Sequence, residues 1–94
     1  MRVISQDGTK DFPYDSSSVS IYGGCVNGRI YVRMQLCGGY DDSVDVADYS
    51  TKEKAIKAIE MLRKAWINGA IEFTHGIYHR NIIFQFPQDD EIEV

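Results

Sequence analysis

The chain has few of the features that mark secreted or membrane proteins. Its 94 residues include only two cysteines, Cys25 and Cys37. A secreted chain of this size usually carries a fuller disulfide framework, so we expect a cytoplasmic protein. No apolar run approaches the roughly 20 residues that a membrane helix needs. Met1 to Ile4 is followed at once by polar residues, unlike a signal peptide. We therefore expect no membrane partner.

The familiar catalytic and cofactor motifs are also missing. The sequence has no P-loop, no G-x-G-x-x-G and no G-x-S-x-G. His75 and His79 have the spacing of a metal pair on a helix, but on a strand they would stand about 13 Å apart. The acidic runs at Asp41 and Asp89 match no calcium loop. We expect no metal, no cofactor and no enzymatic activity.

The formal net charge of −4 argues against duplex nucleic acid as a partner. It leaves room for a small anionic ligand, because the charges are unevenly placed. Acidic residues crowd the segment 88–94, which we interpret as a solvated tail, and basic residues gather in 52–64 and at Arg29, Arg33 and Arg80. A local basic pocket on an acidic protein is therefore possible.

The length predicts one domain, 1–94, with a thin core, and many such proteins gain stability as homo-oligomers. Turn signals lie at 6–9, 27–28 and 38–42, and they divide the first half of the chain into short strands. A helix with an apolar stripe follows over 50–68, opened by a capping box of Ser50 and Glu53 and ended by Gly69. A last strand runs over 77–86. We predict an α+β fold, a mainly antiparallel sheet with this one amphipathic helix packed on one face.

The hairpin around Asn27-Gly28 predicts its own register, since a type I′ turn there pairs Val26 with Arg29. Val19 and Ile21 then lie on an apolar face of the hairpin. Tyr22 faces Arg33 on the opposite, polar face, and Gly24 faces Tyr31. A slip of one residue would destroy this agreement between the two strands.

The polar face of this hairpin is the main candidate site, with Tyr22, Arg29, Tyr31 and Arg33. Arginine matches phosphate oxygens with a rigid fork, and tyrosine offers a flat surface on which a base can stack. A small-molecule nucleotide is the ligand that these residues suggest. The plainer interpretation, a solvated outer face of an antiparallel hairpin, is the one that the residues alone favour.

A second candidate lies in the last strand, where Arg80 interrupts an apolar face. A buried arginine needs an acidic partner or a pocket, whereas an arginine at the strand's exit into solvent needs neither. His79 and Asn81 beside it could hydrogen bond a ligand, and are equally ordinary on an exposed face.

Three blocks of sequence carry a resemblance to a known family. They are Met1 to Thr9 with Phe12 to Tyr14, Tyr49 to Ala55 running to Arg63, and Phe84 to Val94. Together they resemble a family of small proteins from phages and prophages of Gram-positive bacteria. The pattern is similar to that of the first-described Thoeris anti-defence proteins.

The resemblance implies a function and an assembly. Proteins of that family sequester cyclic ADP-ribose-type signals, which bacterial TIR-domain defence proteins make, and do not cleave them. Some also form higher oligomers and hold cyclic oligonucleotides. The resemblance thus implies a homo-oligomer with ligand sites at subunit contacts, and it assigns no binding residue in this sequence.

Two other classes of function remain open. One is a protein-binding inhibitor of a bacterial defence enzyme, similar to anti-CRISPR proteins, which the acidic tail would support. The other is a small nuclease or phosphodiesterase built on His75 or His79, which a metal dependence would favour.

Overall fold

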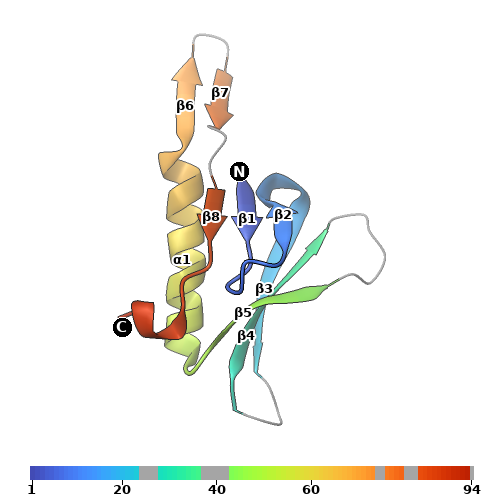
Figure 1. Ribbon diagram of the computed structural model, residues 1–94. Helices are drawn as coiled ribbons and strands as arrows, with labels where there is room; N and C mark the ends of the chain where they lie inside the picture. The colour runs from blue at the N-terminus through green and yellow to red at the C-terminus, as the bar shows by residue number, and fades with distance from the viewer. Residues whose placement is uncertain (24–27, 37–42, 74–75, 80–82, 94) are drawn as a thin grey trace.

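The computed structural model describes residues 1–23, 28–36, 43–73, 76–79 and 83–93, with the backbone alone for 70–73 and 76–79. Its elements follow one another along the chain as shown in Figure 1. They are β1 (Arg2–Ile4), β2 (Asp11–Pro13), η1 (Tyr14–Ser16), β3 (Ser17–Gly23), β4 (Ile30–Leu36), β5 (Val44–Tyr49), α1 (Lys52–Asn68), β6 (Ala70–Phe73), β7 (Gly76–His79), β8 (Ile83–Gln85) and η2 (Asp89–Glu91).

The predicted α+β class is confirmed, but the strands form three small sheets rather than one. Their orders are β2-β1-β8, β3-β4-β5 and β6-β7. β1 and β8 pair in parallel, and the other described pairs are antiparallel. The parallel pair places the first strand of the chain beside the last one (Figure 1). No helix in the described part of the chain is long and apolar enough to cross a membrane.

The first turn forms where the sequence predicts it. Gly8 has a φ of +77°, a left-handed conformation that glycine adopts without strain. Asp7 accepts hydrogen bonds from the hydroxyls of Ser5 and Thr9 at 2.6 and 2.7 Å and from the Thr9 N–H at 3.0 Å. These bonds hold the pKa of Asp7 well below its usual range. The turn is thus closed by side chains as well as by the strand ladder.

The β3–β4 hairpin has the predicted faces but not the predicted register. Tyr22 pairs with Tyr31 and Ser20 with Arg33, so the strands are offset by two residues from the pairing that a two-residue turn would give. The pairing predicted from a two-residue turn at Asn27-Gly28 is therefore wrong. Residues 24–27 of the connection lie outside the described part of the chain. A shift of two residues keeps every side chain on its face. Hence Val19 and Ile21 still point to the core.

The N-cap of the helix lies one residue later than predicted. Thr51 is the N-cap, and its hydroxyl accepts from the Lys54 N–H at 3.2 Å, so the predicted capping box of Ser50 and Glu53 is wrong. Ser50 instead donates its N–H and hydroxyl to the carboxylate of Asp89 at 2.7 and 3.0 Å. The helix ends at Asn68, and Gly69 is its C-cap, as predicted.

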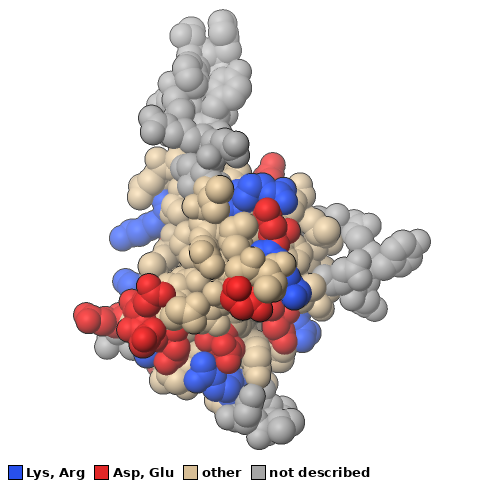
Figure 2. Space-filling view, viewed as in Figure 1, with Lys and Arg blue, Asp and Glu red and all other residues tan. Residues whose placement is uncertain are grey.

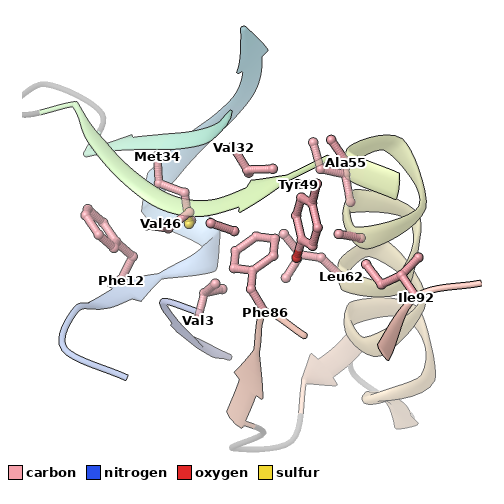
Figure 3. Packing of buried hydrophobic residues seen from close by; sticks show 13 residues of the cluster. Val3, Phe12, Val32, Met34, Val46, Tyr49, Ala55, Leu62, Phe86 and Ile92 are labelled. Atoms are coloured by element: carbon pink, nitrogen blue, oxygen red, sulfur yellow. The ribbon is translucent and has the colours of Figure 1, made fainter. Parts of the chain in front are cut away.

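The core lies between α1 and the two three-stranded sheets. Figure 3 shows Phe86 at its centre, with Val3, Tyr49 and Leu62 around the ring. All four residues are at most 1% exposed. Tyr49 also donates its hydroxyl to the carbonyl of Pro87 at 2.9 Å. β5 and the C-terminal segment are thus joined by both apolar packing and a hydrogen bond.

Two predictions about the C-terminal third are wrong. The segment 77–86 is not one strand, because β7 pairs with β6 and β8 pairs with β1. The acidic segment 88–94 is not simply solvated, since Ile92 is 4% exposed and Asp89 binds the start of α1. Lys54 donates to the Asp89 carbonyl at 2.9 Å and contacts its carboxylate at 3.3 Å. The carboxylate sits at a helix N-terminus, where a negative charge is stabilising.

We expect this anchor to make the stability depend on acid pH. The Ser50 N–H first, and then the Ser50 hydroxyl and Lys54, lower the pKa of Asp89 in the folded state. The unfolded chain therefore binds more protons, so stability is present above the ordinary carboxylate pKa and is lost as pH falls through the folded pKa. Urea midpoints measured between about pH 5 and 3 should fall less steeply for Asp89→Asn than for the wild type. Asp90→Asn, which makes none of these bonds, should behave as the wild type. Parallel pH profiles for Asp89→Asn and the wild type would contradict the prediction.

Candidate functional site

Four of the predicted site residues lie together on the polar face of the β3-β4-β5 sheet. We call Tyr22, Arg29, Tyr31 and Arg33 the tyrosine–arginine surface. The rings of Tyr22 and Tyr31 stack at 5.3 Å between centroids and 19° between planes. The guanidinium carbon of Arg33 lies 4.2 Å from the centroid of the Tyr22 ring. The observed register of β3 and β4 produces this stack, because it places the two tyrosines directly opposite each other.

Each arginine of this surface is paired with an aspartate of β5. Arg33 Nε contacts Asp45 Oδ1 at 3.2 Å, and Arg29 Nε contacts Asp48 Oδ2 at 3.1 Å. The Tyr22 hydroxyl lies 2.8 Å from both carboxylate oxygens of Asp45 and accepts from Arg33 Nη2 at 2.9 Å. The sequence alone does not predict either aspartate as a partner, and the two carboxylates hold the guanidinium groups in place.

A β-bulge in β5 brings the two aspartates to this face. Val32 pairs with Ala47 while Arg33 pairs with Asp45, so Val46 is an extra residue between them. Side chains three apart on a regular strand point to opposite faces. Without the bulge, Asp45 and Asp48 would therefore lie on opposite faces of the sheet.

The charges of the surface cancel locally. The two arginines face two aspartates, so the site has no excess of positive charge. The hydrogen bond to Asp45 is the main cause that raises the pKa of the Tyr22 hydroxyl, and the same carboxylate raises the pKa of Arg33. The hydroxyl therefore stays protonated and the guanidinium charged. Within the described part of the chain, Arg33 uses two of its five N–H groups on these partners, which leaves N–H donors for a ligand.

A hollow of about 230 Å³ lies beside the surface. Tyr31 forms part of its wall, and Asp45 and Asp48 connect it to the arginines. Carboxylates, an amide, an aromatic ring and small apolar groups share its lining, which consists of Gln6, Asp7, Tyr31, Asp45, Val46, Ala47 and Asp48. Among the described residues, no three or more His, Cys, Asp or Glu side chains are grouped to hold a metal ion. The carboxylates that line the hollow suit ligands with hydroxyl and amino groups, which donate hydrogen bonds to them.

Gln6, which lines this hollow, forms hydrogen bonds with β5 and with the C-terminal segment. Its side-chain amide accepts from the Asp48 N–H at 3.1 Å and donates to the carbonyls of Asp48 and Pro87 at 3.1 and 3.0 Å. Its backbone N–H donates to the Val46 carbonyl at 2.6 Å, and its carbonyl accepts from Gln88 Nε2 at 2.8 Å. One residue of the first turn therefore joins β5 to the C-terminal segment. A glutamine in a turn gives no sequence signal of such a role.

The other predicted site residues do not join this group. His79 ends β7, where its backbone pairs with Ala70 in the β6–β7 hairpin. That hairpin extends beyond the C-terminal end of α1, apart from β4 and β5 (Figure 1). Arg80 and Asn81 lie outside the described residues, as do Gly24, Cys25, Cys37 and His75.

Comparisons of the chain with family models, curated proteins and solved structures find no match. The fold and the site thus define the class only as a small α+β protein. Its distinguishing feature is a tyrosine–arginine surface beside an acidic hollow.

Proposed function

We propose that the protein binds a nucleotide-derived immune signal of the cyclic ADP-ribose type and sequesters it without cleaving it. The observation that carries this proposal is the tyrosine–arginine surface next to the 230 Å³ hollow. A base would stack on Tyr31, and the ribose hydroxyls would donate to Asp45 and Asp48. The pyrophosphate would bind the N–H groups of Arg33 outside the hollow, away from its carboxylates.

The neutral charge of the site shapes the expected binding. Recognition would rest on stacking and directed hydrogen bonds rather than on long-range attraction, because each arginine has an aspartate partner. A fixed guanidinium also loses less conformational entropy when it binds a phosphate. A protein that lowers the free concentration of a signal needs tight binding, and a preformed site favours it.

The resemblance to the phage anti-defence family supports the same proposal, and the residues that carry it form the scaffold of the fold. Its three blocks contact one another: β1 pairs with β8, Tyr49 bonds Pro87, and Ser50 bonds Asp89. The tyrosine–arginine surface lies outside these blocks. The resemblance therefore concerns the scaffold, and the ligand would be set by the segments that the scaffold carries.

Thermal unfolding with candidate ligands tests the proposal. Cyclic ADP-ribose isomers and cyclic di- and trinucleotides would each be added at about 100 times Kd, where binding to the native state alone adds about 2.7 kcal/mol. The protein is then heat-denatured and the released ligand analysed by mass spectrometry. A raised Tm with intact ligand is the expected result. An altered ligand would make the protein an enzyme, and an unchanged Tm with every nucleotide would refute the proposal.

A second candidate function is inhibition of a bacterial defence enzyme by direct protein binding. Figure 2 shows red side chains gathered over the η2 end of the chain, where Asp90, Glu91 and Glu93 are exposed. Arranged carboxylates can mimic the phosphates of a nucleic acid. Charge reversal of these three residues should abolish inhibition in this case and leave nucleotide binding unchanged in the first.

A further inference from the structure

β3 is an open edge of its sheet. In the order β3-β4-β5 it has a strand on one side only. Among the described residues, only β4 forms backbone hydrogen bonds with Ser18 to Gly23. The opposite edge, β5, is covered, because Gln6 bonds the backbone of Val46 and Asp48. The sheet can therefore be extended at β3 and not at this part of β5.

The sequence of β3 lacks the devices that keep an edge strand from pairing. Natural edges are protected by charged side chains, proline, bulges or short length. β3 has seven residues, Ser-Ser-Val-Ser-Ile-Tyr-Gly, with no charge and no proline, and its pairing with β4 runs without a shift of register. In a chain with a net charge of −4, this strand is a place where two copies can meet without charge repulsion.

The strand is also complementary to itself. Antiparallel pairing about Ser20 would place Val19 opposite Ile21 of a second copy on the core-facing side, and Ser18 opposite Tyr22 on the polar side. Apolar residues thus meet apolar ones and polar residues meet polar ones in both halves. A two-fold pairing uses the same patch twice and closes after two copies.

A hollow next to the edge has room for the side chain that this pairing delivers. It measures about 370 Å³ and lies between η1, β3 and α1. Val19, Ile59 and Leu62 contribute the apolar part of its lining. Polar groups come from Tyr14, Asp15, Ser17 and Arg63. Ile21 of the second copy would sit against Val19 at this hollow and cover its apolar lining.

We propose that β3 is the contact surface for a second copy of this chain, which joins two three-stranded sheets into one six-stranded sheet across a two-fold axis at Ser20. The inference does not rest on the proposed ligand. It also has a consequence for the tyrosine–arginine surface, which lies on the polar face of the same strands. The two copies of Tyr22 would be four residues apart along the paired strands, about 13 Å, on one continuous face.

Cysteine crosslinking of the full chain tests the position of the axis. In Ser20→Cys the two new cysteines would face each other, with Cα atoms about 4.5–5.5 Å apart, within the range of a disulfide. In Ser18→Cys they would be about 13 Å apart and could not bond. Ser18 and Ser20 are both exposed, so both variants should fold. We expect mild oxidation to give a covalent dimer of Ser20→Cys, with the bond mapped to residue 20, and not of Ser18→Cys. Equal crosslinking of the two variants, or none, would overturn the proposal.

Charge substitution at the same residue tests the contact without a covalent bond. Ser20→Lys places two like charges opposite each other and should weaken the dimer about fivefold or more, and Ser18→Lys should not. Mixing Ser20→Lys with Ser20→Glu should restore dimers that contain one chain of each. Sedimentation equilibrium measures all of these, and circular dichroism checks the fold. A wild type that stays monomeric, or a dimer that Ser20→Lys leaves intact, would exclude β3 as the surface for a second copy.

Discussion

Replacing Phe86 with alanine is expected to cost about 3–5 kcal/mol of stability, the range for a large side chain removed from a packed core. A domain of this length has about 5–14 kcal/mol in total. The variant should therefore lose about a fifth or more of the stability of the fold. If the total is about 5 kcal/mol, up to about half of the molecules would be unfolded at 25 °C.

The position of Phe86 explains why so much depends on it. The residue is 1% exposed, and its backbone N–H donates to the Ile4 carbonyl at 3.1 Å just beyond β8. Its ring lies among Val3, Tyr49 and Leu62, which come from β1, β5 and α1 (Figure 3). Removing the ring would leave a cavity where both three-stranded sheets and the helix meet, and no single element could move to fill it.

The control for this prediction is Ile83→Ala in the adjoining strand, β8. Ile83 is 70% exposed, so its loss should change stability by less than about 0.5 kcal/mol. Urea unfolding followed by circular dichroism measures both variants, with a similar m-value expected for each. If Phe86→Ala cost no more than Ile83→Ala, the packing shown in Figure 3 would be wrong.

The elements that depend on local pattern could be predicted from the sequence. The α1 stripe with Ala55, Ile59 and Leu62, the stop at Gly69 and the turn at Gly8 all appear where expected. The faces of β3 and β4 were also correct. Alternation fixes which side a residue takes, and it is insensitive to the two-residue shift that the hairpin contains.

The features that were missed depend on contacts between distant segments. The cap at Thr51 replaces one at Ser50 because Asp89, 39 residues away, binds Ser50. The bulge at Val46 leaves no local signal, although it turns its carbonyl toward the N–H of Gln6. The division of 77–86 between two sheets follows from the pairing of β8 with β1. Such pairings are decided by tertiary packing, which a single sequence does not show.

The candidate site was predicted in part for the same reason. Tyr22, Tyr31 and Arg33 could be placed on one face by alternation alone. Their arrangement needed the true register and the bulge, which supply the stack and the aspartate partners. The sequence thus placed the arginines on this face without their aspartates, and the structure pairs each of them with one.

The second large effect is expected at Tyr31, if the protein binds a nucleotide as proposed. Its ring lines the 230 Å³ hollow and is the platform for the base. Loss of one base–aromatic stack costs about 1–3 kcal/mol, so Tyr31→Leu should weaken the affinity by about 5- to 150-fold. Tyr31→Phe keeps the ring and should bind within a few-fold of the wild type. Isothermal titration with the nucleotide identified by thermal unfolding measures both.

A matched pair of arginine variants separates recognition from the general loss of a charge. Arg33 and Arg2 each form an exposed ion pair with an aspartate, at 3.2 and 2.9 Å, with the second pair on the β1–β2 sheet. Arg33→Ala removes both the phosphate donors and the cation over Tyr22, so it should weaken nucleotide binding, whereas Arg2→Ala should leave it unchanged. Equal losses in the two variants would mean that only the net charge of the protein matters. Weak binding by Arg33→Ala alone would place the phosphates at the tyrosine–arginine surface, and unchanged binding by both would move the site elsewhere.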